Sequence, residues 1–470
     1  MKRANYILFS SKNKYYIFDY FNIIYGEIDR NLYTIFNKIL ENGNDIYSID
    51  ADENISNIIK NFYDQDLFFS DRDVVKFDSY EEAFLSMPSI HACNMKCKYC
   101  FAHSGENFEG DIRDMDEKTL KDSLDYLYFE YFKECQNFRF DFVSGGEPLL
   151  NFKAIMNIIH VTDEYRKSNK NTQFWLCTNG TINSEDIFSA LNLHRFNIGI
   201  SIDGEKSYND SFRVYMNGHG TYDNVIKTIG NVINNNSYTR NFRNVWGLVV
   251  VTAKTTSLVA TLKHHSLLGF QKVQMRIVRT REDYGLNKDT IEIFKKLYDE
   301  LFDFFISEFE NGSTFYMEII LNDNDYLGKM MRRIMLRTIV ANRCQAGKNK
   351  ISLAANGDLY PCDAFVGNNE YCIGNALTKE LYSNKFKNLF TSDIPKCNKC
   401  WARYICGGDC YHNSMIMCES IMDVDPTFCE LQKYMLENII LLFCYMNTEN
   451  GDLFDRLARK TKIGTREGLR

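Results

Sequence analysis

This 470-residue chain has few prolines, no long apolar run and no excess of basic residues. It has only 5 prolines and no Gly/Ser-rich or Pro-rich tract, which excludes an extended flexible linker. The strongest apolar run, Ile439 to Cys444, is far too short to cross a membrane. The N-terminus has no apolar segment of the signal-peptide kind, so we expect a cytoplasmic protein with no membrane partner.

Acidic residues outnumber basic ones, 62 to 55, and the formal net charge is −7. A nucleic-acid-binding protein is expected to carry a basic surface, so we expect no nucleic-acid partner. The 15 cysteines are the unusual feature of the composition. In a reduced compartment such a density favours metal ligation over disulfides.

Three cysteines lie close together, as Cys93-x3-Cys97-x2-Cys100. Three thiolates can hold a cubane iron–sulfur cluster and leave its fourth iron open for another ligand. A zinc knuckle is the alternative, with His91 or His103 as its fourth ligand.

From about residue 86 the chain alternates β-prone runs with helical periodicity. The expected strands are 87–91, 138–143, 174–178, 196–202, 245–252 and 273–278, and the expected helices are 116–133, 152–167, 184–191, 222–234 and 256–268. Six successive βα units predict a parallel sheet with right-handed crossovers, an open or partial (β/α)6 barrel. In such barrels function lies at the carboxyl ends of the strands.

Polar motifs follow these strands. Ser144-Gly145-Gly146-Glu147-Pro148 follows the second, Thr178-Asn179-Gly180 the third, and Ser201-Ile202-Asp203-Gly204 the fourth, with Arg213 twelve residues after Ser201. Together with the three thiols, and with Tyr99 and Phe101 beside Cys100, these motifs resemble those of radical S-adenosylmethionine (SAM) enzymes. The resemblance implies that Cys93, Cys97 and Cys100 hold a [4Fe–4S] cluster whose open iron binds SAM. It also implies SAM contacts from Tyr99, Gly146, Glu147, Ser201 and Arg213. For Arg213 the alternative is a salt bridge on a helix face, and Thr178-Asn179-Gly180 is typical of any turn.

Seven further cysteines are concentrated in the C-terminal third: Cys344, Cys362, Cys397, Cys400, Cys406, Cys410 and Cys429. Their spacing resembles the SPASM domain, which carries two auxiliary iron–sulfur clusters, so the resemblance implies three [4Fe–4S] clusters in all. It assigns Cys397, Cys400, Cys406 and Cys429 to an outer cluster. It assigns Cys344, Cys362 and Cys410 to an inner one, whose fourth ligand is a substrate thiolate, water or another protein atom. Two zinc ribbons are the alternative on spacing alone.

Asp363 directly follows Cys362. Anaerobic sulfatase-maturing enzymes share this Cys-Asp pair, and the resemblance implies that Asp363 accepts a proton during substrate oxidation. A turn residue bonded to nearby backbone amides is the alternative.

Residues 1–85 are expected to form a separate winged-helix-like unit. Its strands are 6–10, 15–19 and 23–28, and its helices are 32–40 and 55–63, with Asn31 and Asp52 near their starts. This order resembles the peptide-recognition element of enzymes that modify ribosomally made peptides, which bind a leader peptide by β-augmentation. An embellishment that only buries a barrel end or an oligomer interface is the alternative.

The remaining expectations concern the domain order. We expect the radical SAM core at 86–310, a linking segment at 311–343, the SPASM domain at 344–445 and a tail at 446–470, which is expected to fray from Asp452 to Arg470. A helix is expected over 290–309, and the basic cluster Lys329, Arg332, Arg333 and Arg337 is expected to be a solvated helix face.

The resemblance implies an α/β radical SAM/SPASM peptide maturase that joins Cys sulfur to carbon in a Cys-rich precursor peptide carrying a leader. An external one-electron reductant of the flavodoxin or ferredoxin type would serve it. Formylglycine formation on sulfatases is the second hypothesis, and a non-catalytic metal-binding adaptor is the third.

Overall fold

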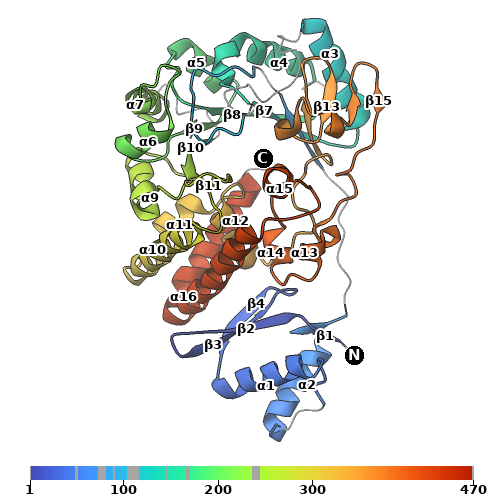
Figure 1. Ribbon diagram of the computed structural model, residues 1–470, viewed down its shortest axis with the longest axis vertical. Helices are drawn as coiled ribbons and strands as arrows, with labels where there is room; N and C mark the ends of the chain where they lie inside the picture. Colours follow the sequence, from blue (N-terminus) through green and yellow to red (C-terminus); the bar gives the residue numbers. More distant parts are fainter. Residues whose placement is uncertain are drawn as a thin grey trace. The chain divides into compact units, whose positions relative to one another are not determined.

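The structure is a computed structural model that describes residues 2–47, 51–71, 81–87, 90–102, 116–142, 145–165, 170–234 and 244–467 (Figure 1). The chain forms two compact units, each discontinuous in sequence. The first consists of Met1–Phe77, Leu286–Arg343 and Phe390–Arg470, and the second of Asp78–Gly285 and Cys344–Leu389. The sequence predicts domains that each occupy one continuous stretch of the chain, whereas these units are grouped by contacts in space. The domain boundaries therefore stay a prediction.

The second unit is built on a ten-stranded sheet in the order β11-β10-β9-β8-β7-β6-β12-β13-β14-β15. Strands β6 to β11 pair in parallel and in chain order, as the sequence predicts. Their bounds are β6 Glu82–Ser86, β7 Asn137–Phe142, β8 Asn171–Thr178, β9 Asn197–Ser201, β10 Asn244–Val251 and β11 Val273–Ile277. The described residues therefore confirm five of the six expected strands.

The first expected strand, 87–91, is wrong, because β6 begins and ends five residues earlier. The ladder ends where Met87 N donates to Asp141 O at 2.9 Å. The next residue, Pro88, has no N–H to donate to a ladder, and the apolar character of this stretch concealed that limit. Residues 88 and 89 themselves lie outside the described residues.

Four strands in this sheet were not predicted. β12 Lys350–Leu353 pairs in parallel with β6, and β13 Asp358–Tyr360, β14 Gly374–Asn375 and β15 Glu380–Leu381 continue the sheet in antiparallel fashion. The segment after Cys344 thus extends the barrel sheet of the second unit.

The parallel strands present different chemistry on their two faces. In β7, buried Phe138 and Phe140 alternate with Arg139 and Asp141. The Phe138 ring packs 4.1 Å from the ring of Tyr128, which belongs to the helical layer, whereas the Arg139 guanidinium lies 3.8 Å from the ring centre of Trp175 in β8. The helices therefore cover an apolar face, and the opposite face carries charge.

The helices of this unit follow the strands (Figure 1). They are α3 Glu117–Asp125, α4 Phe152–Tyr165, α5 Glu185–Leu193, α6 Lys206–Phe212, α7 Tyr222–Ile229 and α9 Leu258–Leu267. The expected helices 116–133 and 222–234 are each an α-helix that continues as a short π-helix, over Tyr126–Tyr131 and Gly230–Asn234. Asp116 and Ser184 cap α3 and α5 through side-chain acceptors, which fixes where these helices begin.

The first unit begins with a three-stranded antiparallel sheet in the order β2-β3-β4. Its elements are β2 Tyr6–Ser11, β3 Lys14–Asp19, β4 Ile24–Ile28, α1 Arg30–Glu41 and α2 Glu53–Asp64, and a small separate sheet pairs β1 Arg3–Ala4 with β5 Phe69–Ser70. The predicted strands and helices are confirmed. Asp52 caps α2 as expected, but the cap of α1 is Asp29 rather than Asn31.

Both faces of this small sheet are covered within the first unit. On one face Tyr6 and Ile17 join a core with Phe36 and Ile39 of α1. On the other, the Phe18 ring lies 6.2 Å from the ring of Trp401, and Tyr25 lies 6.3 Å from Phe443. Burial on both faces explains why the central strand reads as the continuous apolar run Tyr-Tyr-Ile-Phe.

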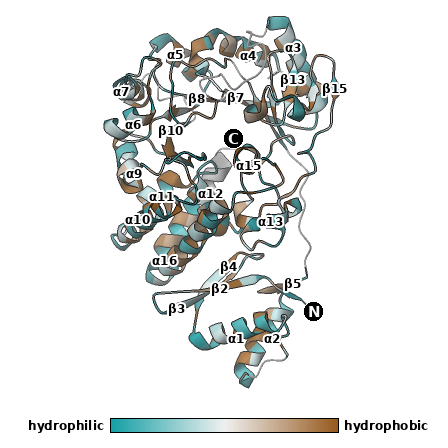
Figure 2. Ribbon diagram, in the orientation of Figure 1, coloured by the Kyte–Doolittle hydropathy of each residue, from teal (hydrophilic) through white to brown (hydrophobic). Residues whose placement is uncertain are grey.

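The rest of the first unit is helical. Its helices are α10 Ile291–Glu310, α11 Phe315–Ile320, α12 Tyr326–Met335, α13 Pro395–Asn398, α14 Arg403–Cys406, α15 Tyr411–Cys418 and α16 Pro426–Glu467. Helices α10 and α16 each carry both hydrophobic and hydrophilic residues (Figure 2). Lys295 of α10 pairs with Glu430 of α16 at 2.7 Å, which ties the two together.

Two expectations for this part are wrong. Arg332 and Arg333 do not form a solvated face: Arg332 is 7% exposed and pairs with Asp323 at 3.0 Å, and Arg333 donates to the carbonyl of Ile405 at 2.5 Å. The segment after Asp452 is not a frayed tail, because α16 continues to Glu467 past a non-helical Asn450, and it buries Leu453 and Leu457.

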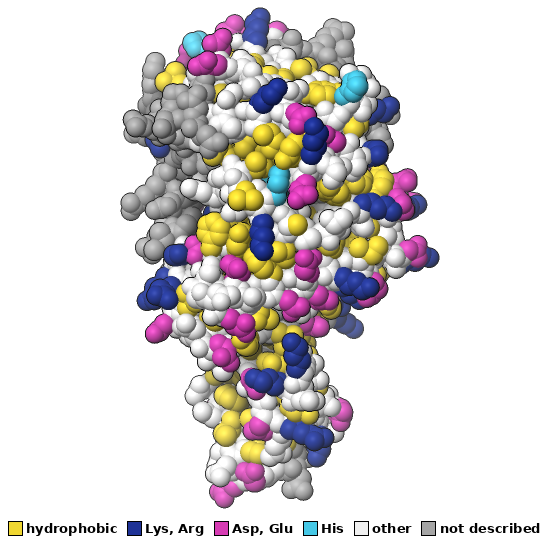
Figure 3. Space-filling model, turned by 90° about the vertical axis from the view of Figure 1, so that its left-hand side faces the viewer, with side chains coloured by type: hydrophobic (Ala, Val, Ile, Leu, Met, Phe, Trp, Pro, Cys, Tyr) yellow, Lys and Arg dark blue, Asp and Glu magenta, His cyan; other side chains and the backbone are white. Residues whose placement is uncertain are grey.

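No helix of the described residues is long and apolar enough to cross a bilayer. Figure 3 shows Lys and Arg side chains interspersed with Asp and Glu side chains over the face drawn.

Candidate functional site

The three-thiol loop is held by the segment that follows α6. Lys96 N donates to Val214 O at 2.8 Å, Lys98 N donates to Phe212 O at 3.0 Å, and Met95 bridges to Tyr215. Within the loop, Cys100 N donates to Cys97 O at 3.1 Å. Arg213 lies on the segment that holds the loop, so two of the predicted site elements are brought together.

The Gly-Gly-Glu turn abuts the start of the same loop. A Cβ added to Gly146 would lie 2.3 Å from Ala92 O and 2.6 Å from His91 C, so the backbone approach requires glycine. Glu147 N donates to Ala92 O at 3.0 Å, one residue before Cys93. The turn after β7 thus fixes the backbone entering the thiol loop.

The Glu147 side chain is 1% exposed and connects the ends of β7 and β8. It accepts hydrogen bonds from Thr178 Oγ1 at 2.8 Å, Asn179 N at 2.6 Å and Leu149 N at 3.1 Å. Burial raises the pKa of Glu147 to about 7, although these three hydrogen bonds act to lower it. Asn179 in turn donates from Nδ2 to Cys93 Sγ at 3.7 Å and to Asn94 Oδ1 at 2.8 Å.

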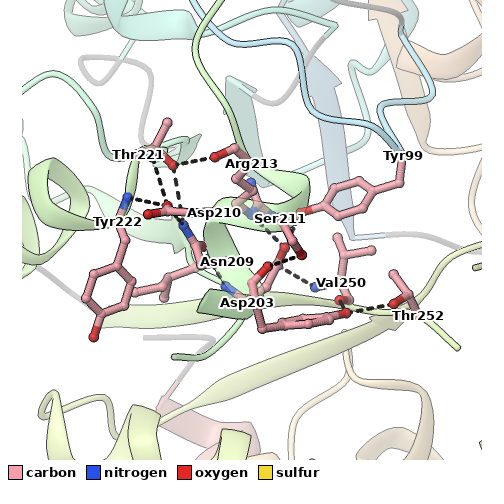
Figure 4. Close-up of polar contacts among 12 residues, drawn as sticks. Tyr99, Asp203, Asn209, Asp210, Ser211, Arg213, Thr221, Tyr222, Val250 and Thr252 are labelled. Atoms are coloured by element: carbon pink, nitrogen blue, oxygen red, sulfur yellow. Dashed lines mark hydrogen bonds and ion pairs between the residues drawn. The ribbon is translucent and has the colours of Figure 1, made fainter. Parts of the chain in front are cut away.

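Asp203 lies at the centre of the other side of the site (Figure 4). It is 0% exposed, it accepts a hydrogen bond from the Tyr99 hydroxyl, and its Oδ1 accepts one from Val250 N at 2.9 Å. Arg213 Nε lies 3.0 Å from its Oδ2. One buried carboxylate therefore joins the thiol loop, the strand β10 and the cation.

Arg213 is buried, and its ion pair is internal rather than on a helix face. Burial acts to lower the pKa of Arg213, but the Asp203 carboxylate raises it above its usual range. The contact with Asp203 is through Nε, so both terminal nitrogens lie outside this ion pair. A planar guanidinium with two such nitrogens is suited to a carboxylate ligand.

The pKa of Cys97 is raised to about 12, mainly by burial. The charge of Arg213 acts to lower it, and Cys100, Asp203 and Cys93 act to raise it. Ser201 ends β9, two residues before Asp203, and so lies at the same carboxyl edge. Its contact with SAM, like those of the other predicted residues, stays a prediction.

The predicted outer cysteine set converges within the first unit. Cys397, Cys400, Cys406 and Cys429 all line one cavity of about 580 Å³. Cys397 lies on α13, Cys406 ends α14 and Cys429 lies in the first turn of α16. Gly407, with a φ of 73°, ends α14 directly after Cys406 and lets the chain turn away.

The chemistry of these thiols is compatible with binding a positively charged metal centre. Burial and, to a smaller extent, the neighbouring Cys406, Cys397, Asp409 and Cys400 together raise the pKa of Cys429 to about 12. Thiols crowded in this way lose their protons when a positive metal centre binds them. Among the described residues, no three His, Cys, Asp or Glu side chains converge tightly enough to hold a single ion. In a cubane each thiolate binds a different iron, so cysteines arranged around a cavity fit that group.

The predicted inner set is divided between the units, with Cys344 and Cys362 in the second and Cys410 in the first. Within the second unit, Gly347 N donates to Pro361 O at 2.9 Å, which links the chain just after Cys344 to the chain just before Cys362. The convergence of all three thiols stays a prediction. None of the 15 cysteines, all of which lie in the described residues, forms a disulfide.

Asp363 is paired with Lys350, the first residue of β12, at 2.8 Å. Burial acts to lower the pKa of Lys350, but Asp363 raises it above its ordinary value. The side chain of Asp363 is therefore held by a cation rather than only by backbone amides, and its role as a proton acceptor stays a prediction.

Sequence reasoning missed Asp203 and Asn179 as organising residues. Both lie in motifs that it singled out, but they were given no role there. Their position directly after strands β9 and β8 was the available signal, because buried polar groups at such edges need partners.

Comparison with known proteins agrees with this geometry. Residues 87–253 match the model of the radical SAM superfamily, and residues 344–401 match that of the SPASM iron–sulfur cluster-binding domain. A cysteine-type anaerobic sulfatase-maturating enzyme of Clostridium novyi (strain NT) is 27% identical over 387 residues, which are 77% of this chain and 96% of that enzyme. The mycofactocin maturase MftC of Mycobacterium tuberculosis is 24% identical over 342 residues, 69% of this chain and 77% of that protein.

A solved structure of native anSMEcpe with bound AdoMet has the same fold. It is 23% identical, has a TM-score of 0.62, and the match covers 78% of this chain and 99% of that chain.

Proposed function

This chain is a radical SAM enzyme with a SPASM iron–sulfur domain, and from that premise we propose that it modifies a ribosomally made, Cys-rich precursor peptide. The proposed product contains bonds between Cys sulfur and carbon. SAM and its cluster supply a 5′-deoxyadenosyl radical that removes hydrogen from a peptide carbon. In this proposal Cys93, Cys97 and Cys100 hold that cluster, and Tyr99, Gly146, Glu147, Ser201 and Arg213 surround SAM. The two auxiliary sets hold two further clusters, and an external one-electron reductant supplies electrons.

The small sheet of the first unit is the feature that best supports a peptide substrate. Because α1 and the Trp401 and Phe443 side chains cover its two faces, an added peptide strand can pair only at an edge. Within the described residues no strand pairs with the outer edge of β2 or of β4. Main-chain hydrogen bonds at such an edge give affinity with little demand on sequence, as leader recognition requires.

Hairpin geometry identifies the groups available at each edge. Lys12 and Asn13 have φ of 48° and 63°, the signature of a two-residue type I′ turn between paired Ser11 and Lys14. Hydrogen-bonded and non-hydrogen-bonded pairs then alternate along the ladder. By this alternation Ser10 directs its N–H outward from β2, and Glu27 directs its N–H outward from β4. Both side chains are exposed.

Proline at one of these two positions is expected to weaken leader binding, because it removes an outward N–H without touching the core. We expect either Ser10→Pro or Glu27→Pro to raise the Kd of a fluorescent leader peptide about tenfold. Ser10→Ala and Glu27→Ala keep the N–H and are the matched controls. If both proline variants bind as the parent does, recognition at an edge of this sheet is wrong.

The modification itself is tested by mass spectrometry. The anaerobic holoenzyme is incubated with reductant, SAM and the peptide from a short Cys-rich reading frame beside the gene. We expect a loss of two hydrogens per crosslink, fewer alkylatable thiols, and fragment ions that link Cys to another residue. An unchanged peptide mass under conditions that consume SAM would contradict the proposal.

Formylglycine formation on a sulfatase is the second candidate, and two observations favour it. A sulfatase-maturating relative matches over 77% of this chain, and Asp363 directly follows the predicted ligand Cys362. The same assay with a sulfatase-derived Cys peptide separates the two functions, since formylglycine formation replaces the Cys sulfur by a carbonyl oxygen and leaves no crosslink.

A further inference from the structure

We propose that Arg343 sets the reduction potential of the outer iron–sulfur cluster by holding a fixed positive charge behind Cys397. The inference deepens the proposed function, and it rests on the assignment of the outer cysteine set to a cluster.

Arg343 is buried in the first unit, with 8% of its surface exposed. Its Nη1 donates to Ser414 Oγ at 2.8 Å and to the carbonyls of Ile421 and Asp423 at 3.4 Å, and its guanidinium lies 4.9 Å from the ring centre of Tyr411. Neutral acceptors and an aromatic ring thus fix the guanidinium. Among the described residues no carboxylate forms an ion pair with it.

The guanidinium lies directly against the wall of the outer cavity. Gly408 lines that cavity, and a Cβ added to it would lie 3.0 Å from Arg343 Nε. Gly408 has a φ of 87°, which favours glycine, and an added Cβ would make a tight contact with the guanidinium. Arg343 Nε is buried and has no hydrogen-bond partner of its own in the described residues.

Cys397 is the predicted ligand that Arg343 reaches. Burial raises the pKa of Cys397 to about 11, while the charge of Arg343 and a hydrogen bond from it act in the opposite direction. A buried guanidinium that is not ion-paired is costly, and an anionic cluster behind Cys397 would supply counter-charge.

The other cations around the cavity have different partners. Lys295 pairs with Glu292 and Glu430, each at 2.7 Å, and Lys396 pairs with Asp423 at 2.9 Å. Lys396 and, to a smaller extent, Arg343 lower the pKa of Asp423, so this carboxylate interacts with both cations. Arg333 lies near another predicted ligand, since it donates to the carbonyl of Cys406 at 3.2 Å. Arg343 differs from these cations by its hydrogen bond to the thiol of a predicted ligand, Cys397.

The expected effect of Arg343 on the reduction potential follows from the charges of the oxidised and reduced cluster. Reduction adds one electron to the cluster and makes or breaks no covalent bond, so it increases the negative charge that faces Arg343. Iron–sulfur potentials depend on net charge and on hydrogen bonds to the sulfurs. A fixed cation that also donates to a ligand sulfur therefore raises the potential of the outer cluster.

The test is a potentiometric titration followed by electron paramagnetic resonance. It uses the holoenzyme carrying Cys93→Ala, Cys97→Ala and Cys100→Ala, so that only auxiliary clusters contribute. The outer-cluster signal is the one lost in Cys429→Ala. In Arg343→Met we expect the equilibrium constant for its reduction to fall about tenfold, a shift of about 59 mV to lower potential. Arg332→Met is the matched control, because Arg332 is equally buried in the same unit but is paired with Asp323.

An outer-cluster potential in Arg343→Met equal to that of the parent would overturn the proposal, and so would an equal shift in Arg332→Met. If Arg343→Met does not retain the cluster, Arg343→Gln is titrated instead. It removes the charge and keeps side-chain N–H donors, so a fall in potential is still expected, and an unchanged potential overturns the proposal.

This readout is independent of the peptide. An unchanged potential in an enzyme that still modifies its peptide rejects the role of Arg343 alone. If the spectrum of Cys429→Ala contains every signal of the parent protein, the assignment of the outer cysteines to a cluster is wrong.

Discussion

Replacing Asp203 by asparagine is expected to lower the free energy of unfolding by about 3 kcal/mol, because it leaves buried Arg213 without its counter-charge. Asp203 is 0% exposed and is also bonded to the Tyr99 hydroxyl and to Val250 N, so its loss also releases the thiol loop from β10. A displacement of about 1 Å at a reacting centre can cost about a hundredfold in rate. We therefore expect deoxyadenosine formation to fall by that order.

Urea denaturation followed by tryptophan fluorescence measures the first effect, since Trp175 and Trp246 both lie in the second unit. Asp223→Asn is the control from the same unit. Asp223 pairs with Lys206 at 2.5 Å, but both side chains are more than half exposed, and such pairs contribute less than about 1 kcal/mol. A free energy of unfolding in Asp203→Asn equal to that in Asp223→Asn would show that Asp203 does not organise the site.

The parallel sheet was predictable because its strands are buried on both faces or alternate strictly. Strand β7, with Phe138 and Phe140 alternating with Arg139 and Asp141, is recognisable from periodicity alone. Strand β6 was misplaced because the next stretch is equally apolar and lies nearer the cysteine motif. Strand β12 was missed because its partner β6 lies more than 260 residues earlier in the chain, at Lys350 against Phe84.

The sets of candidate ligand cysteines could be proposed from the sequence because iron–sulfur ligation requires a fixed residue type at a fixed spacing, and their ligation of clusters stays a prediction. Gly146 was predictable for the same reason, and its close approach to Ala92 gives the physical cause. Asp203 and Asn179 were not assigned, since a carboxylate or an amide after a strand is equally compatible with an ordinary turn. Only the fold shows that Asp203 meets Tyr99 and Arg213.

For the basic residues of α12, the sequence pattern predicted exposure to solvent and the structure shows burial. A run of cations on a helix is usually solvated, but Arg332 and Arg333 are directed by tertiary contacts to Asp323 and to the carbonyls of Ile405 and Cys406. The local pattern does not record such partners, because Ile405 and Cys406 lie 72 and 73 residues from Arg333, and Asp323 precedes the helix that carries Arg332.

Replacing Cys97 by alanine is expected to have the largest effect on activity. Cys97 is the middle thiol of the loop that Val214 and Phe212 hold in place, and Arg213 lies near it. Without it the proposed cluster loses one of three ligands, so we expect the reconstituted protein to contain about four fewer iron atoms per chain. Cys177→Ala, in β8 and outside every predicted ligand set, is the matched control and should keep the iron content of the parent.

Deoxyadenosine released from SAM by the dithionite-reduced, reconstituted Cys97→Ala protein is the decisive quantity. We expect release by the parent and by Cys177→Ala, and none above the rate of the protein-free control from Cys97→Ala. Release from Cys97→Ala at the parental rate would contradict the assignment of this loop to a SAM-binding cluster.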